Sequence, residues 1–405
     1  MKKLTIVLVL FLVSFQSNAQ EMRTQNQSGF DFGKGLNFSF NDGAYSFKLS
    51  GMIQPRYQNI KEKGTEANNV FSAKRAFLSI SGKAVNEKIG FFVQTDYSQT
   101  DPLLDAWISY DLFKNTTIFV GQKLSFVNNR SMNNYETHMQ FTERGYLSSS
   151  FSNTGREFGL FVESKFGSKI GVVPQLAVTS GDGKNSFGSD SRDTDLGGLK
   201  FGGRLDVYPL GYFKEGNQNA TADLMYEDDL KVVLGAALSK NVGVSNSVGE
   251  GHGNFELFDV NGKSNLPDYT QMYIDILAKY KGISFLAEYV NASAENLKGI
   301  YTDATSSTIL APTQISEYLA LGDAYNLQLG YLTRSGFSFD VRYENIASEF
   351  DTNTNAVLQD SSATTFGISK YIKGNSIKIQ AAYSSIDFDV APTQNSFELM
   401  LQIVF

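Results

Sequence analysis

A long irregular stretch at residues 123–152 gathers many of the side chains that could do chemistry. Its charged members stand among Asn, Ser and aromatic residues, and they are Lys123, Arg130, Glu136, His138, Glu143 and Arg144. The stretch has neither long alternation nor a sustained helical stripe. Connections of this length inside a domain are normally functional or disordered, and the aromatic residues argue against disorder. We therefore predict a folded functional loop that helps to build a hollow structure.

Catalytic chemistry finds little support in the residue types. The chain has two histidines, His138 and His252, both in predicted loops, and no cysteine. A hydrolase would need a Ser–His–acid set or a carboxylate pair in register, and histidines without cysteine supply too few ligands for zinc. We predict that the chain is not an enzyme, holds no metal and uses no cofactor. Both histidines are interpreted as solvated loop residues.

The acidic stretch at residues 181–195 (GDGKNSFGSDSRDTD) has a spacing faintly like that of a calcium loop. It lacks the glycine and terminal glutamate of an EF-hand, and no helix flanks it. We interpret it as a solvated external loop, with loose divalent-cation binding as the alternative. The formal net charge of −7 argues against a nucleic-acid partner, which would require a basic face.

The elements around these loops have the period-two alternation of β-strands. About sixteen segments from Tyr45 to Phe405 place apolar residues on one face and polar residues on the other, and Phe337–Asn345 is a clear example. No segment after the N-terminus has eighteen consecutive apolar residues, so no transmembrane helix is expected there. A transmembrane β-strand needs only about ten residues with alternate ones apolar.

Short and long connections alternate along the chain, which places turns at one end of the strands and loops at the other. Ser98–Pro102 is short where a loop is due, and Pro209–Asp229 is long where a turn is due. The pattern is typical of outer-membrane barrels. The last segment, Ser396–Phe405, alternates and ends on an aromatic residue, as in proteins recognised for barrel assembly. We predict an all-β, transmembrane antiparallel β-barrel of about 16 strands around a water-filled lumen.

The N-terminus has the pattern of an export signal. Met1-Lys2-Lys3 is basic, Leu4–Phe15 is apolar but too short to span a membrane, and small residues precede Gln20. We predict a signal peptide at 1–19, cleaved near Ala19-Gln20, a short periplasmic leader at 20–43 and a barrel at 44–405. The predicted location is the outer membrane of a Gram-negative bacterium.

Several local motifs, in order, resemble the family of phosphate-selective porins O and P. They lie between residues 74 and 209 and are KRAFLSISGK (74–83), DAWISY (105–110), GQK (121–123), TER (142–144), GREFG (155–159) and RLDVYP (204–209). The resemblance implies a trimer of sixteen-stranded barrels, with a third loop that folds inward and narrows the pore. It also implies that Arg and Lys side chains bind anions at that constriction.

Carried onto this sequence, the resemblance implies a set of solute-binding or constriction residues: Arg56, Arg75, Lys88, Lys123 and Asp105. Alternation turns Arg56, Arg75 and Lys88 to the lumen, whereas Lys74 faces outward unless a bulge intervenes. Lys123 is expected to touch the solute. The expected loop-anchoring residues are Glu143, Arg144 and Arg156.

We therefore predict a porin for passive diffusion of small solutes, with anions such as phosphate as the expected cargo. Its expected partners are small anionic or polar solutes, outer-membrane lipid and two further copies in a homotrimer, with no nucleic acid. The charged side chains assigned to the lumen include comparable numbers of each sign, which leaves two alternatives open. They are a non-selective general porin and a non-conducting barrel that binds or adheres through its external loops.

Overall fold

The structure, a computed structural model, describes residues 27–85, 87–184, 197–251 and 253–405. The predicted signal peptide, His252 and most of the acidic stretch lie outside these ranges. The strands are β1 (Gln27–Asp31), β2 (Gly35–Phe40), β3 (Tyr45–Glu62), β4 (Asn68–Ala84), β5 (Ile89–Asp96), β6 (Leu103–Phe113), β7 (Thr116–Leu124), β8 (Arg156–Ser164), β9 (Gly171–Thr179), β10 (Lys200–Tyr208), β11 (Lys231–Asn241), β12 (Asp268–Tyr280), β13 (Ile283–Glu295), β14 (Gly322–Leu332), β15 (Phe337–Ser348), β16 (Ser361–Lys373), β17 (Ile377–Phe388) and β18 (Gln394–Val404). The helical segments are α2 (Arg130–Asn133), η1 (Glu136–His138), α3 (Tyr146–Phe151), η3 (Asn217–Asn219) and η4 (Pro312–Glu317).

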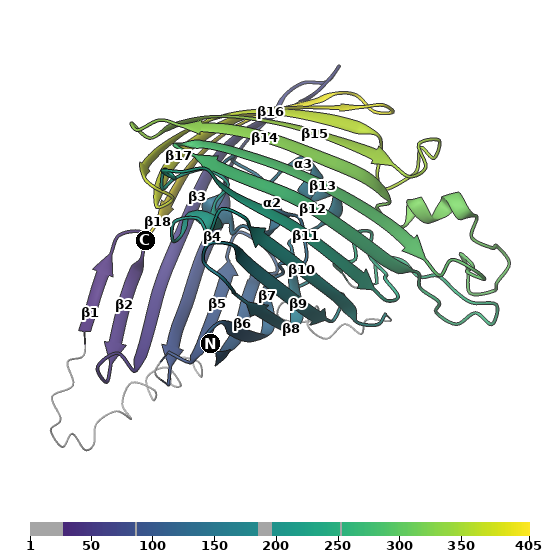
Figure 1. Ribbon diagram of the computed structural model, residues 1–405. Coiled ribbons are helices and arrows are strands. Elements are labelled where there is room, and N and C mark those ends of the chain that lie inside the picture. Colours follow the sequence, from purple (N-terminus) through teal and green to yellow (C-terminus); the bar gives the residue numbers. More distant parts are fainter. Residues whose placement is uncertain (1–26, 86, 185–196, 252) are drawn as a thin grey trace, which may run out of the picture.

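Strands β3 to β18 form a closed antiparallel barrel (Figure 1). Each strand pairs with the next along the chain, and β18 pairs with β3 to close the wall. Within the described ranges these are sixteen strands, which confirms the predicted fold class. The connections at 85–88, 114–115 and 281–282 lie at one end, here called the turn end. The opposite end carries the long connections and is called the loop end.

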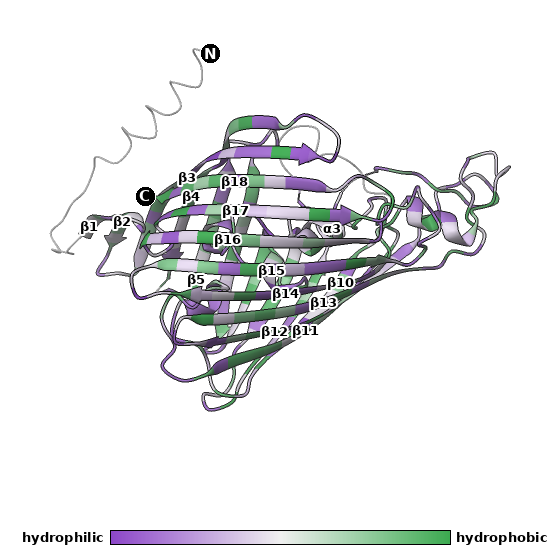
Figure 2. Cartoon of the chain, turned by 90° about the horizontal axis from the view of Figure 1, so that it is seen from above, coloured by the Kyte–Doolittle hydropathy of each residue, from purple (hydrophilic) through white to green (hydrophobic). Residues whose placement is uncertain are grey.

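Burial along the strands is that of a barrel with a polar interior. In β14, Leu327 and Leu329 point outward and are exposed, whereas Asn326 and Gln328, which alternate with them, are buried. The outer surface is consequently rich in exposed apolar side chains, and Figure 2 shows the hydropathy changing along the strands. Such an exterior fits a hydrocarbon environment. Among the described residues, no helix is long and apolar enough to cross a membrane.

The predicted leader contains a hairpin that extends the sheet at the turn end. β1 pairs with β2, and β2 pairs with residues 45–49 of β3. Further along, residues 52–62 of β3 pair with β18 instead of β2. Between the two pairings, the backbones of Gly51 and Phe405 form two hydrogen bonds of 2.7 and 2.9 Å. β3 therefore serves both as a barrel strand and as the base of the hairpin.

A β-bulge interrupts the pairing of β3 with β4. Gln54 pairs with Arg75, but the next residue, Pro55, pairs with Ala73, so Lys74 has no partner in the ladder. Proline cannot donate a backbone hydrogen bond, and within sheets it is tolerated at bulges. The bulge changes the alternation of β4 at the point where two basic residues follow one another.

Two connections pack against the inner face of the wall. The first is residues 125–155, here called the third loop, which contains α2, η1 and α3. The second is residues 209–230, here called the turn-end insert, which joins β10 to β11 where the alternation predicted only a turn. They meet where Asn134 Nδ2 donates to Thr221 Oγ1 at 3.4 Å. At the loop end, apolar residues of the long connections form a large buried cluster with Leu147 and Phe151 of α3.

Candidate functional site

Carboxylates on the barrel wall bind the helical segments of the third loop. Glu288 of β13 accepts hydrogen bonds from the Ser131 backbone at 2.7 Å and from its hydroxyl at 2.6 Å. Glu344 of β15 accepts from the backbone of Tyr146 and Leu147, at 2.9 and 3.0 Å. These acceptors satisfy backbone donors at the first turns of α2 and α3, which have no partner within the helix.

A four-membered ion cluster holds α2 against the wall. Arg130 donates to Asp275 at 2.5 Å and to Asp206 at 2.8 Å, and Arg204 donates to the same two carboxylates at 2.5 and 2.8 Å. All four side chains are largely buried. Two guanidinium groups and two carboxylates neutralise one another, so Arg130 is a structural residue rather than a free cation.

A second cluster closes the two ends of the third loop. Arg156 of β8 donates to Asp105 at 3.2 Å and to Glu136 at 2.6 Å, and Arg144 donates to Glu136 at 2.9 Å. Asp105 also accepts from the Leu124 backbone at 3.0 Å. Burial raises the pKa of Glu136, but Arg156 and Arg144 outweigh it and bring that pKa well below its usual value. Glu136 is therefore ionised at neutral pH.

Glu143 is the contact between the third loop and the β4 bulge. Its carboxylate pairs with Lys74 and, at 2.9 Å, with Arg75. The bulge thus allows consecutive basic residues to reach one carboxylate. Burial raises the pKa of Glu143, but Arg75 and Lys74 lower it far more.

The structure brings some of the expected constriction residues together and separates others. Arg75 lies at the third loop, whereas Arg56 pairs with Glu398 of β18 at 2.9 Å. Asp105 binds the loop backbone and Arg156, and so belongs with the anchors. Lys88 is exposed in the turn between β4 and β5, away from the third loop.

Lys123, the residue expected to touch the solute, lines an interior cavity of about 670 Å³. It belongs to β7, and its ammonium group donates to the Leu124 carbonyl at 2.9 Å. The rings of Phe119, Phe126 and Phe161 surround it, with centroids 4.9 to 5.1 Å from the nitrogen. These cation–π contacts hold the side chain in place.

The expected anchors divide into two kinds. Glu143 contacts the wall through Lys74 and Arg75, and Arg156 contacts the loop from the wall. Arg144 instead acts within the third loop, where it donates to the Ser131 and Asn134 carbonyls at 2.8 Å. Sequence reasoning missed the wall and loop carboxylates that bind backbone amides, Glu250, Glu288 and Glu344. Glu250 accepts from three consecutive backbone amides at residues 153–155.

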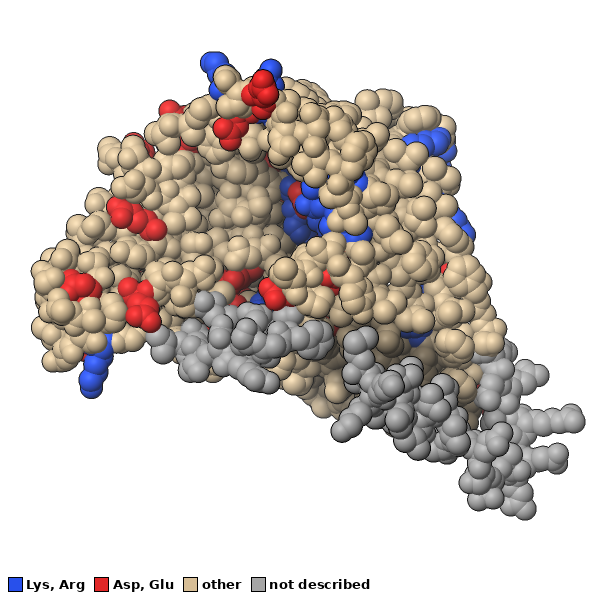
Figure 3. Space-filling view, turned by 180° about the vertical axis from the view of Figure 1, so that it is seen from behind, with Lys and Arg blue, Asp and Glu red and all other residues tan. Residues whose placement is uncertain are grey.

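Two cavities lie on either side of the Arg75 contact. The outer cavity, about 360 Å³, faces the loop end and is lined by Lys74, Arg75, Arg144 and Arg156, with Asp96, Glu136 and Glu143 beside them. The inner cavity, about 310 Å³, faces the turn end and is lined by β3, β4, β5 and η1. Phe77 lines both. Figure 3 shows Lys and Arg side chains gathered in a hollow of the molecule.

A chain of hydrogen bonds separates the two cavities. Arg75 donates to Glu143 and, at 3.0 Å, to Gln54, and Gln54 donates to Gln402 at 2.7 Å. Gln402 in turn donates to the Thr137 carbonyl of the third loop at 3.0 Å. The chain connects the loop to β3, β4 and β18, and we call it the polar bridge.

Solved structures of outer-membrane proteins share this fold. The outer-membrane-expressed OmpT of Vibrio cholerae has a TM-score of 0.52 at 12% identity, over 89% of this chain and 98% of that one. Its in-vitro folded trimer form gives 0.50 at 13%, over 89% and 99%. The outer membrane channel DcaP of Acinetobacter baumannii gives 0.52 at 14%, over 89% and 98%. At these identities the likeness shows the fold alone.

No family model and no curated protein matches the chain. What the comparisons support is the coarser part of the sequence-based resemblance, the fold of an outer-membrane barrel. Membership of the phosphate-selective porins O and P stays a prediction.

The comparisons correct the prediction that the chain is not an enzyme. Several of the similar barrels are OmpT, which is named only as an outer membrane protein with no activity stated, and a shared fold does not define an activity. The exclusion was therefore wrong, because nothing in this fold rules out catalysis. Among the described residues, no group of three His, Asp or Glu side chains is placed to hold a metal ion.

Proposed function

We propose that the chain is an outer-membrane channel for passive diffusion of small polar solutes. The observation that carries the proposal is the pair of cavities that share Phe77, one open toward each half of the barrel. A solute would pass from the outer cavity around Phe77 and the polar bridge into the inner cavity. The third loop, held by Glu143 and the wall carboxylates, is the constriction in this proposal.

A modest preference for anions is the finer part of the proposal. In the outer cavity four basic side chains face three carboxylates, and most of them are paired. Rings of unpaired charge select ions strongly, whereas neutralised pairs do so weakly. Lys48 of the inner cavity adds one positive charge to this nearly neutral lining, which favours anions slightly. We therefore expect phosphate to permeate without a strong advantage over chloride.

Further parts of the proposal concern the surroundings of the barrel. Its apolar exterior would contact outer-membrane lipid, and the signal peptide would be removed near Ala19-Gln20 when the chain is exported. We also propose a homotrimer, supported by the trimer form of one structural neighbour. Native mass spectrometry in detergent tests the trimer, and a monomeric mass would refute it.

The channel is tested by conductance of the purified protein in planar lipid bilayers. We expect an open pore whose reversal potential in a salt gradient shows a small anion preference. Phe77→Ala enlarges the junction of the two cavities and should raise the conductance. Phe161→Ala is the matched control, because Phe161 is also buried but packs around Lys123 and lines neither of the two cavities.

Three outcomes would contradict the proposal. A folded barrel without conductance would favour the non-conducting, adhesive alternative. An equal rise in conductance for both phenylalanine variants would mean that the passage does not run past Phe77. A preference for cations would refute only the proposed anion preference and would leave the channel function standing.

A further inference from the structure

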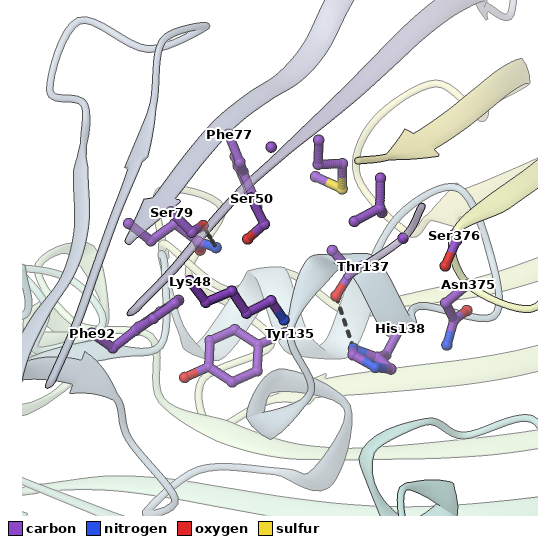
Figure 4. Close-up of a pocket in the computed structure, with 15 residues that line it drawn as sticks. Lys48, Ser50, Phe77, Ser79, Phe92, Tyr135, Thr137, His138, Asn375 and Ser376 are labelled. Atoms are coloured by element: carbon purple, nitrogen blue, oxygen red, sulfur yellow. Dashed lines mark hydrogen bonds between the residues drawn. The ribbon is translucent and has the colours of Figure 1, made fainter. Parts of the chain in front are cut away.

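The inner cavity differs in charge from the rest of the barrel interior. Its described lining includes Lys48 but no Asp or Glu. Lys48 of β3 makes no hydrogen bond or ion pair with any described residue, and Figure 4 shows its side chain reaching toward Tyr135 and His138. The cations of the outer cavity, by contrast, bind carboxylates. A single ammonium group without a counter-charge in a concave site is suited to one negative charge on a ligand.

The other titratable groups of the inner cavity do not add to this charge. Burial, followed by the nearby Lys378 and Lys279, lowers the pKa of His138 to about 4, so the imidazole is neutral at pH 7. It contacts the hydroxyl group of Thr137 at 2.8 Å. Burial likewise raises the pKa of Tyr135, which keeps its hydroxyl protonated. The lining therefore carries about one positive charge at neutral pH.

One side of the inner cavity is apolar and aromatic. Phe77, Phe92 and Tyr135 line it, and the rings of Phe92 and Tyr135 meet edge to face with centroids 6.2 Å apart. An inorganic anion would lose hydration against these rings without gaining partners. A planar organic body would instead bury apolar area and stack on them.

A buried acceptor in the same lining lacks a donor. Gln94 is 7% exposed, and its amide nitrogen donates to Ser79 at 2.9 Å. Among the described residues, its Oε1 atom has no hydrogen-bond partner. Leaving a buried acceptor unsatisfied is unfavourable, and a ligand hydroxyl in the cavity would satisfy it.

We propose that the inner cavity is a binding site for a small aromatic monocarboxylate that carries a hydroxyl group. Lys48 binds the carboxylate, the rings of Phe77, Phe92 and Tyr135 hold the body, and Gln94 accepts from the hydroxyl. The cavity volume of about 310 Å³ lies at the small end of the range for ligand pockets. The inference that this ligand is transported rests on the proposed channel function. The inference that it binds in the inner cavity does not.

The test is equilibrium dialysis of labelled 4-hydroxybenzoate against the barrel in lipid nanodiscs. We expect saturable binding that weakens about tenfold in Lys48→Met, because a charge-assisted hydrogen bond is lost. Lys61→Met is the matched control, since Lys61 is an exposed lysine at the other end of β3. Benzoate should bind about fivefold more weakly than 4-hydroxybenzoate. Gln94→Met should remove that difference between the two ligands.

The competing results are distinct. Failure of 4-hydroxybenzoate to bind, or an equal loss in both lysine variants, overturns the proposal. Competition by inorganic phosphate at lower concentration than benzoate would assign the site to a mineral anion and overturn it as well. Dialysis requires no current, so a barrel that binds but does not conduct refutes the channel and keeps this site.

Discussion

The third loop is fixed to the barrel wall by buried ion pairs, in which one charged group often binds two partners of opposite charge. Removing one partner of such a pair costs about 3–5 kcal/mol, because the other charge stays buried without compensation. Alternation in the sequence was enough to place Arg75 in the interior. The role of Lys74 depended on a bulge that alternation does not reveal. The contacts of Glu288 and Glu344 with the third loop depend on tertiary placement, which a strand pattern does not contain.

His138 makes the stability of the third loop depend on pH. Its pKa is about 4 in the folded barrel against an ordinary 6.5, because burial and the cations Lys378 and Lys279 outweigh Glu136. The unfolded chain therefore binds more protons between these values, and stability falls as pH drops from 6.5 to 4. The full effect is about 3 kcal/mol. Thermal unfolding in detergent at pH 7, 6 and 5 should show this loss.

The matched variant is His138→Gln, which cannot be protonated in this range. It should flatten the profile between pH 6.5 and 5 while keeping an acid-induced loss at lower pH, where the carboxylates that pair with arginines in the third loop are neutralised. An identical slope in both proteins would mean that His138 is not the group responsible.

At the scale of elements, the turn-end insert is the feature that the alternation of connection lengths marked as unusual but did not explain. Lys279 of β12 donates to the carbonyls of Asn217, Ala220 and Ala222, at 2.6 to 3.0 Å. Asp223 accepts from the Gly282 backbone at 2.8 Å. The insert is thus built onto β12 and the turn after it. The hairpin of β1 and β2 was likewise hidden within an apparently polar leader.

Lys279→Met should release the turn-end insert. Three buried carbonyl groups lose their donor, so we expect a stability loss of about 1–3 kcal/mol or more, together with faster tryptic cleavage after Lys214. Lys281→Met is the control, because Lys281 lies exposed in the adjacent turn, where its ammonium group sits over the Tyr280 ring and donates to none of these carbonyls in the described residues. If cleavage after Lys214 is unchanged in Lys279→Met, the insert is held by its apolar contacts instead.

At the scale of the whole molecule, the sequence was sufficient for the wall and insufficient for the contents of the lumen. Strands repeat with period two and end at turns, so each can be recognised locally. The polar bridge joins residues from β3, β4, β18 and the third loop, and no local pattern connects them. Apolar residues of the long connections, such as Leu257 and Ile315, pack into the loop-end cluster in the same non-local way.

The apolar exterior predicts a depth-dependent cost for charge. Leu327 faces outward at the middle of β14, so Leu327→Arg should destabilise the barrel by about 2–4 kcal/mol in a bilayer. Tyr331→Arg, near the turn end of the same strand, should cost about 0–1 kcal/mol. Unfolding in urea from phosphatidylcholine vesicles measures both. Equal costs would mean that β14 does not cross a hydrocarbon layer.

The seam between β18 and β3 has a consequence for the order of folding. It joins Arg56 to Glu398, which are 342 positions apart in the chain. Contacts of such sequence separation form slowly, because a long chain must be organised before they can be made. The third loop and the turn-end insert carry buried charges that bind strands on several sides, so they would have to be seated while the seam is still open. Closure of the wall would then be the rate-limiting event, and the interior would be assembled before it.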